Sequence, residues 1–133
     1  MLPLIVYRRP IRRRIRLARP EDKPIVTEIA NYAFAPKDRT VWINGAFGRS
    51  DRTIYVLEEY GKVEGFIIIR YEETDLRIDL IGTWKPRTGI CRALVDYVSY
   101  SDRRGTEVVA GTYDGGDFYQ ALGFKCSPSS KLA

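Results

Sequence analysis

A glycine turn at the start of a predicted helix is the segment of this chain best suited to bind an anion. Residues 87–94 read Arg-Thr-Gly-Ile-Cys-Arg-Ala-Leu. Such a turn presents several backbone N–H groups that have no partner within the helix, and the helix dipole adds partial positive charge at the same point. The turn therefore predicts a bound phosphate group, although it does not specify which one.

The absence of histidine limits the chemistry that this chain can perform. It excludes Ser-His-Asp and Cys-His nucleophile systems and any metal site with histidine ligands. The two cysteines, Cys91 and Cys126, are far apart, which indicates neither a zinc site nor a disulfide framework. Cys91 is better interpreted as a small buried apolar residue than as a nucleophile. Acid–base chemistry therefore falls to Tyr, Cys, Lys, Asp or Glu, and we expect no metal.

The length and composition predict one compact domain. The chain has 133 residues, of which 44% are hydrophobic, and this suffices for a single core. Its longest apolar run, residues 65–69, is far below the roughly 20 residues that a membrane-spanning helix needs. The arginines of the Arg8–Arg19 segment interrupt any apolar stretch of a signal peptide. We therefore expect a cytoplasmic protein that does not cross a membrane.

The net charge of +5 is concentrated near the N-terminus. Residues 1–20 carry seven arginines and no acidic residue, whereas the rest of the chain carries 15 basic and 17 acidic residues. The seven are Arg8, Arg9, Arg12, Arg13, Arg14, Arg16 and Arg19. Such a segment can neutralise the phosphates of nucleic acid or anionic lipid, or it can form a solvated edge strand on which arginine prevents aggregation. We prefer the edge strand, and we divide the chain into a basic arm or extra edge strand at 1–13 and a single domain at 14–133.

The first half of the chain predicts a strand, two helices and an antiparallel meander of three strands. These lie at Arg14–Arg19, Pro20–Phe34, Asp38–Phe47, Thr53–Tyr60, Lys62–Tyr71 and Leu76–Leu80. Asp22 can cap the first helix, because Pro24 is tolerated only in a first turn. A tight turn at Gly61 joins the first two strands of the meander.

The second half predicts a helix, a strand, a short helix and a last strand. These lie at Thr88–Asp102, Glu107–Thr112, Gly115–Leu122 and from Phe124 onward. A strand, a crossover helix and a strand in this order require parallel pairing or a splayed approximation of it. The predicted fold is therefore an α/β (α+β) mixed sheet, in which an antiparallel meander precedes a parallel strand pair and helices flank the sheet.

Residues 118–124, Phe-Tyr-Gln-Ala-Leu-Gly-Phe, and the glycine turn together resemble the two signature segments of the GNAT superfamily of acetyl-CoA-dependent N-acyltransferases. The predicted order of elements is also similar to the GNAT fold, from about Arg14 to Lys125. The resemblance implies an N-acetyltransferase that uses acetyl-CoA as co-substrate and an amine as acceptor. The chain departs from the family pattern at Pro86, where a basic residue is usual, and at Cys91, where a second small residue is usual.

The resemblance also implies where acetyl-CoA lies. In the family, pantetheine lies between two splayed strands, which correspond here to Arg77–Thr83 and Glu107–Tyr113. The diphosphate lies on the amides of the turn, and Arg87, Lys85 or Arg92 adds charge-assisted contacts. The cofactor-binding residues implied in this way are Ile81, Gly82, Thr83, Arg87, Thr88, Gly89, Ile90, Cys91, Arg92, Ala93, Thr112 and Tyr119.

Two catalytic residues follow from the same resemblance. Tyr119 matches the tyrosine that protonates the departing thiolate of coenzyme A, although a tyrosine on an amphipathic helix is also a common core residue. Asp79, Glu72 and Glu73 lie on or beside the strand from which the family often draws a carboxylate base. An exposed strand face explains all three equally well, and ordered water replaces the base in some members. We select Asp79.

Three functions are compatible with the sequence. The first, which we predict, is acetyl transfer to a primary amine of a small molecule, peptide or protein by direct attack. The second is a degenerate GNAT-fold module that binds acyl-CoA, or nothing, and regulates a partner. The third is a nucleic-acid-associated protein that binds through the Arg8–Arg19 arm. Tyr97 and Tyr100, on the long helix, also leave room for a homodimer.

Overall fold

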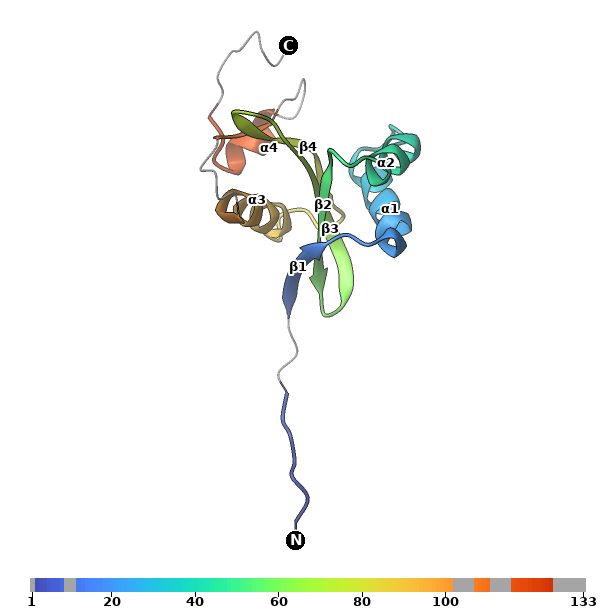
Figure 1. Ribbon diagram of the computed structural model, residues 1–133, viewed down its shortest axis with the longest axis vertical. Coiled ribbons are helices and arrows are strands. Elements are labelled where there is room, and N and C mark those ends of the chain that lie inside the picture. The colour runs from blue at the N-terminus through green and yellow to red at the C-terminus, as the bar shows by residue number, and fades with distance from the viewer. Residues whose placement is uncertain (1, 9–11, 102–106, 111–115, 126–133) are drawn as a thin grey trace.

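The computed structural model describes residues 2–8, 12–101, 107–110 and 116–125. Within these residues the order of elements up to α4 is the predicted one (Figure 1). The elements are β1 (Arg13–Leu17), α1 (Lys23–Ala33), α2 (Thr40–Phe47), β2 (Thr53–Glu59), β3 (Lys62–Tyr71), β4 (Asp75–Thr83), α3 (Ile90–Ser101), β5 (Glu107–Ala110) and α4 (Gly116–Ala121). A short 3₁₀ turn, η1 (Pro20–Asp22), precedes α1.

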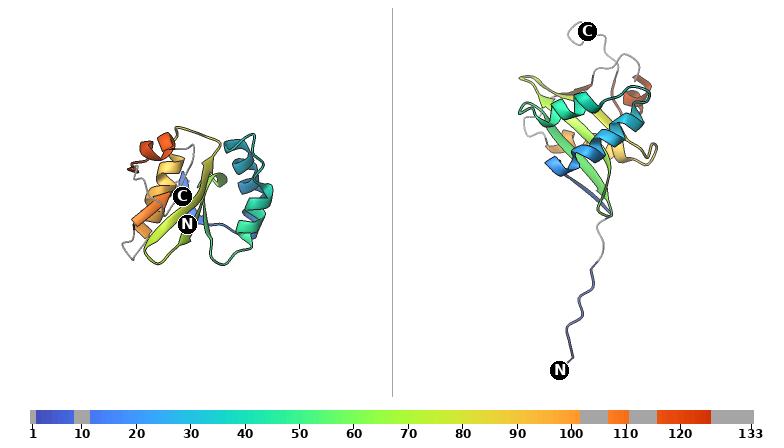
Figure 2. Two further views of the ribbon diagram at one scale, coloured as in Figure 1. Left: turned by 90° about the horizontal axis from the view of Figure 1, so that it is seen from above. Right: turned by 90° about the vertical axis from the view of Figure 1, so that its right-hand side faces the viewer.

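The described strands form one sheet in the order β1-β2-β3-β4-β5. The first three pairs are antiparallel, and β4 pairs in parallel with β5 from Asp75 opposite Glu107 to Ile78 opposite Ala110. Helices α1 and α2 cover one face of the sheet, and α3 and α4 lie on the other (Figure 1, Figure 2). The structure therefore confirms the predicted fold class, including the parallel pair at one edge.

Several element boundaries differ from the prediction. β1 begins at Arg13, because this residue already pairs with Glu59 of β2. α2 begins at Thr40 rather than Asp38. α3 begins at Ile90 rather than Thr88, because the residues before it include two with left-handed backbone angles.

The predicted last strand does not begin at Phe124. The amide of Phe124 donates to the carbonyl of Tyr119, and neither Phe124 nor Lys125 belongs to a strand. The rest of that predicted strand, including Cys126, lies outside the described residues, as does Thr112.

Two apolar layers hold the sheet between its helices. The layer on the α3 side is built from Leu57, Ile67, Ile69, Leu76, Ile78, Ile81, Ile90, Cys91, Leu94, Val95 and Val98. The layer on the α1 and α2 side is built from Val26, Ile29, Ala30, Ile43, Ala46, Ile54, Val56, Phe66, Ile68 and Leu80. Strands β2, β3 and β4 contribute to both layers, so their side chains are buried on both faces. No helix among the described residues is long and apolar enough to span a membrane.

Strands β3 and β4 each contain one bulge, and an acidic residue occupies each bulge. In β3 the register passes from Gly65 opposite Leu57 to Val63 opposite Glu58, which leaves Glu64 as the extra residue. In β4 it passes from Leu80 opposite Ile68 to Ile78 opposite Ile69, which leaves Asp79 as the extra residue. Bulges are enriched next to active sites, where they re-aim a side chain.

Gly65 lets α3 approach the sheet closely. A Cβ atom at this position would lie 2.5 Å from the Cγ2 atom of Ile90 and 3.5 Å from the Cδ1 atom of Leu94. Ile90 is only 1% exposed, so it has little space to move away. The first turn of α3 therefore packs directly against β3 at Gly65, which has no side chain.

We expect Gly65→Ala to lower the free energy of unfolding by about 1–3 kcal/mol, the usual cost of overpacking a core. Gly45→Ala is the matched control, because no atom lies within 4 Å of an added Cβ at that position of α2. The control should be neutral or stabilising by up to about 1 kcal/mol, since alanine favours a helix more than glycine does. Urea unfolding of both variants measures the change in the free energy of unfolding. Equal changes in the two variants would contradict the close packing of α3 against Gly65.

Candidate active site

The turn between β4 and α3 contains two residues with left-handed backbone angles. Arg87 and Gly89 have positive φ angles of 64° and 81°. The carbonyl of Gly89 accepts the amide of Ala93, which closes the first turn of α3. For glycine the left-handed conformation costs nothing, whereas for Arg87 it costs about 1 kcal/mol. The loop thus holds a conformation that its sequence alone does not favour.

Several amides at the start of α3 are available to a ligand. Within the described part of the chain, the amides of Thr88, Gly89, Ile90, Cys91 and Arg92 have no hydrogen-bond acceptor. These are the donors that the first turn of any helix leaves unsatisfied. The sequence predicted an anion site on these amides, and the structure brings all of them together at one end of α3.

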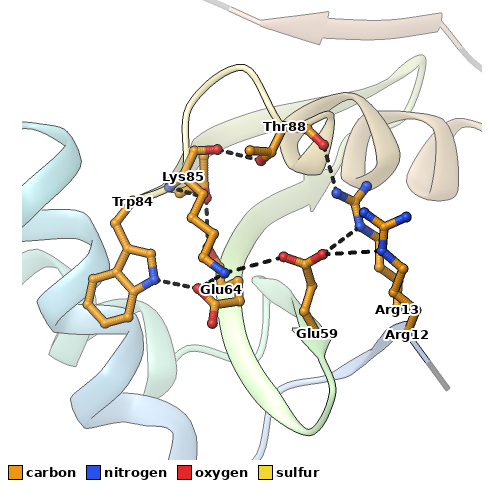
Figure 3. A network of polar contacts seen from close by, with 8 residues as sticks. Arg12, Arg13, Glu59, Glu64, Trp84, Lys85 and Thr88 are labelled. Carbon is orange, nitrogen blue, oxygen red and sulfur yellow. Dashed lines mark hydrogen bonds and ion pairs between the residues drawn. The ribbon is translucent and has the colours of Figure 1, made fainter. Parts of the chain in front are cut away.

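Glu64 anchors the start of this loop. Its Oε2 atom accepts a hydrogen bond of 2.7 Å from the indole Nε1 of Trp84 and lies 3.5 Å from Nζ of Lys85. Its backbone carbonyl accepts the hydroxyl of Thr83 at 2.7 Å. Glu64 is only 7% exposed, so its carboxylate depends on these partners for stabilisation. The bulge in β3 therefore turns an acidic side chain toward the end of β4 (Figure 3).

Glu59 and Arg13 hold the same loop from the opposite side (Figure 3). The Oε2 atom of Glu59 accepts the Nε of Arg13 at 3.1 Å, and its Oε1 atom lies 3.6 Å from Nζ of Lys85. The hydrogen bond from Arg13 lowers the pKa of Glu59 below its ordinary value. Arg13 also donates from Nη2 to the carbonyl of Thr88 at 2.7 Å. No local pattern in the sequence identifies Arg13, Glu59 and Glu64 as residues of this site, because their partners are distant in the sequence.

Tyr119 lies beside the first turn of α3. It packs against the apolar layer that contains Cys91, and its ring stacks edge-on with Phe118 at 5.1 Å and Phe124 at 5.5 Å. Burial, and to a smaller extent Cys91, raises the pKa of Tyr119 above its ordinary value. Burial also raises the pKa of Cys91 to about 11. Both groups are therefore protonated at neutral pH, and Tyr119 can serve as a proton donor.

Arg92 of α3 forms a hydrogen bond to α4, the helix that contains Tyr119. Its Nη2 donates to the carbonyl of Ala121, at the end of α4. Arg92 was predicted to bind the diphosphate, and in the structure one of its donors is used inside the protein. The contact fixes α4 relative to the first turn of α3, and so it helps to place Tyr119.

Asp79 does not lie in the loop, but two residues before Ile81 on the strand that leads into it. Its carboxylate contacts Nε of Arg52 at 2.6 Å and Nη2 of Arg70 at 3.4 Å. The Arg52 contact is an ion pair without hydrogen-bond geometry. Glu72 and Glu73, the other candidate bases, lie in the turn before β4, at the opposite end of that strand from the loop.

The remaining predicted cofactor residues lead into the loop. Ile81 is buried in the layer that faces α3. At Gly82 an added Cβ would lie 3.1 Å from the ring of Phe66 and 3.4 Å from Cβ of Ala33, so this position cannot carry a side chain without displacement. The hydroxyl of Thr83 is used by Glu64. Among the described residues no group of His, Cys, Asp or Glu side chains is suited to hold a metal ion.

Arginines of the basic segment are partly used inside the domain. Arg16 donates to both carboxylate oxygens of Asp22, at 2.7 and 3.0 Å, and to Glu58 at 2.6 Å. The amide of Arg19 donates to Asp22 at 2.7 Å. Asp22 therefore precedes α1 as predicted but binds these groups instead of capping the helix. The hydrogen bond from Arg16 lowers the pKa of Asp22, and the pairing agrees with an edge strand.

Comparison with solved structures shows which proteins share this fold. Ard1 from Thermoplasma volcanium matches with a TM-score of 0.73 and 24% identity, over 89% of this chain and 86% of Ard1. The ribosomal-protein-S18-alanine N-acetyltransferase of Escherichia coli matches with a TM-score of 0.72 and 18% identity, over 83% and 73%. AAC(6')-Iy, in complex with a bisubstrate analogue of CoA and acetylneamine, matches with a TM-score of 0.68 and 14% identity, over 88% and 93%.

No protein-family model matches the chain, and no curated protein matches its sequence. The solved structures nonetheless agree on one architecture over most of the chain. The chain has the fold of the GNAT acetyltransferases.

The Arg16–Asp22 pair predicts a defined pH dependence of stability. The pKa of Asp22 is lower in the folded protein than its unfolded value of about 3.9. The pair therefore stabilises the fold fully at pH values above about 3.9, and this stabilisation is lost as the pH falls through the folded pKa. We expect Asp22→Asn to lower the free energy of unfolding at pH 7 by about 3 kcal/mol, and we expect this deficit to shrink in acid.

Urea unfolding between pH 2 and 7 measures that deficit. Asp51→Asn is the control, since Asp51 pairs with Arg49 and Arg52 but is 48% exposed, and surface pairs contribute little. A deficit for Asp22→Asn that is independent of pH would show that the carboxylate charge is not what stabilises the pair.

Proposed function

We propose that this protein is an acetyl-CoA-dependent N-acetyltransferase that acetylates a primary amine of a small molecule, peptide or protein by direct attack. The observation that carries the proposal is the first turn of α3, where amides with no acceptor among the described residues lie beside a protonated tyrosine. The fold supports it, because the similar structures named above include the ribosomal-protein-S18-alanine N-acetyltransferase and a complex with a CoA conjugate. That likeness concerns the fold, so the activity rests on the residues of the site.

The residues at the end of β4 and in the loop fit the chemistry of coenzyme A. A diphosphate carries negative charge and accepts hydrogen bonds, and the free amides of residues 88–92 with the dipole of α3 supply the matching donors. Lys85 and Arg87 add cationic side chains from the same loop. In this proposal the pantetheine lies along Ile81, Gly82 and Thr83. Thr112, the other predicted contact, lies outside the described residues.

Acetyl transfer requires three events that these residues can promote. The neutral amine attacks the thioester carbonyl, so that a C–N bond forms and an oxyanion develops. The C–S bond then breaks, and the thiolate takes a proton from the hydroxyl of Tyr119, which its raised pKa keeps protonated. The amine nitrogen finally loses its extra proton.

Asp79 is the proposed acceptor of that proton. Its place in the β4 bulge puts a carboxylate on the strand that precedes the cofactor residues. Arg52 and Arg70 contact the same carboxylate, at 2.6 and 3.4 Å. Ordered water is the alternative acceptor, and an unchanged pH–rate profile in Asp79→Asn would favour it.

Binding of acetyl-CoA is the first consequence to test. A ligand at 100 times its dissociation constant adds about 2.7 kcal/mol to the free energy of unfolding, which raises the melting temperature of a domain of this size by roughly 3–6 °C. We expect this rise with acetyl-CoA and desulfo-CoA, and a smaller one with ATP at the same concentration. Equal rises with ATP and acetyl-CoA would indicate a general anion site, and no rise with either would refute the proposal.

We expect Tyr119→Phe to lower kcat by about 10²–10³, in the range for loss of a general acid, while leaving the dissociation constant for acetyl-CoA unchanged. The matched control is Tyr100→Phe, because Tyr100 is 89% exposed on the outer surface of α3. Release of the CoA thiol in the presence of an amine panel measures kcat, and calorimetry measures binding. A normal kcat for the Tyr119→Phe enzyme would show that Tyr119 is not the general acid.

A further inference from the structure

We propose that Arg13, the first residue of β1, is the positioning residue of the cofactor loop and replaces the basic residue that the loop lacks at Pro86. This inference rests on the proposed function, since it concerns how the loop binds the diphosphate of acetyl-CoA. The contact between Arg13 and Thr88 links two segments of the chain, the arginine-rich segment and the glycine turn.

The guanidinium of Arg13 bridges two acceptors on different elements. Its Nε donates to Oε2 of Glu59 in β2 at 3.1 Å, and its Nη2 donates to the carbonyl of Thr88 in the loop at 2.7 Å. The side chain is 28% exposed, so the contacts are partly shielded from water. Glu59 thus orients Arg13, and Arg13 holds the loop (Figure 3).

The hydrogen bond from Arg13 to the Thr88 carbonyl affects how well the loop can bind an anion. A carbonyl that faces a phosphate repels it, whereas the amides beside it attract it. Because it accepts a hydrogen bond from Arg13, the Thr88 carbonyl is held toward β1. The amide groups of Thr88 and Gly89 have no acceptor among the described residues. Arg13 therefore selects the backbone conformation in which this short loop presents N–H groups.

Arg13 also brings positive charge to the glycine of the turn. Its Nη1 atom lies 3.6 Å from the position that a Cβ of Gly89 would occupy. A guanidinium has five N–H donors, and the two contacts above use only two of them. Pro86 cannot provide such a charge, and Lys85 is drawn toward Glu59 and Glu64. Arg13 thus adds a cation from β1 beside Gly89, in addition to the Arg87 side chain of the loop itself.

The bridge requires arginine rather than any basic residue. Nε and Nη2 belong to one rigid planar fork, which can reach Glu59 and Thr88 at once. The single ammonium of lysine lacks this geometry. Arg13→Lys keeps the charge, so it separates the positioning effect from simple electrostatic attraction.

The test compares acetyl-CoA with S-acetylpantetheine, which lacks the diphosphate, as acetyl donors. We expect Arg13→Ala to reduce the preference for acetyl-CoA, expressed as the ratio of the two kcat/KM values, by about tenfold, the effect of one charge-assisted contact. Arg13→Lys should lose a substantial part of the same preference. Arg14→Ala is the matched control, because Arg14 is the next residue of β1 and is exposed, and it should leave the preference unchanged.

The outcomes separate this inference from the proposed function. If the unmodified protein transfers acetyl from neither donor, the proposed function fails, and the inference fails with it. If the unmodified protein prefers acetyl-CoA and Arg13→Ala keeps the full preference, the proposed function stands and the inference is overturned. A lower melting temperature of Arg13→Ala with an unchanged preference has the same meaning, since it shows that Arg13 only stabilises the fold.

Discussion

The close approach of α3 to β3 at Gly65 is the contact on which the candidate site depends. Ile90 and Leu94 of α3 lie over a residue without a side chain, and the buried stripe of α3 continues through Val98. This packing fixes the start of α3 beside the end of β4, and the free amides of its first turn are fixed with it. The apolar core thus places the amides that we propose as the anion site, although none of its side chains is polar.

Charged side chains then determine how the loop is held. Glu64, in the β3 bulge, binds Trp84 and Lys85 at the start of the loop. Arg13, oriented by Glu59, binds Thr88 near its end. A short loop with left-handed Arg87 and Gly89 is costly in isolation, and the partners at its two ends offset that cost. A preorganised loop does not have to be ordered by its ligand, which favours binding.

The sequence predicted the features that depend on periodicity and on turn chemistry. The hairpin at Gly61, the α3 stripe and the parallel pair of β4 and β5 all have local signals, and the structure confirms them. The bulges at Glu64 and Asp79 were not predicted, because one extra residue in an apolar strand leaves no pattern. The Arg13–Thr88 contact was missed for a different reason: the two residues are 75 positions apart, and only the folded sheet brings them together. Asp22 is local, yet its Arg16 pair competed with the cap that was predicted.

The central claim is that the amides at the start of α3 bind the diphosphate of coenzyme A. Two-dimensional ¹H–¹⁵N spectra of the protein, recorded while CoA is added, test this claim residue by residue. We expect saturable shifts that are largest at the amides of Gly89, Ile90, Cys91 and Arg92. Saturation with shifts confined to the arginines of residues 12–19, and none at the start of α3, would contradict it.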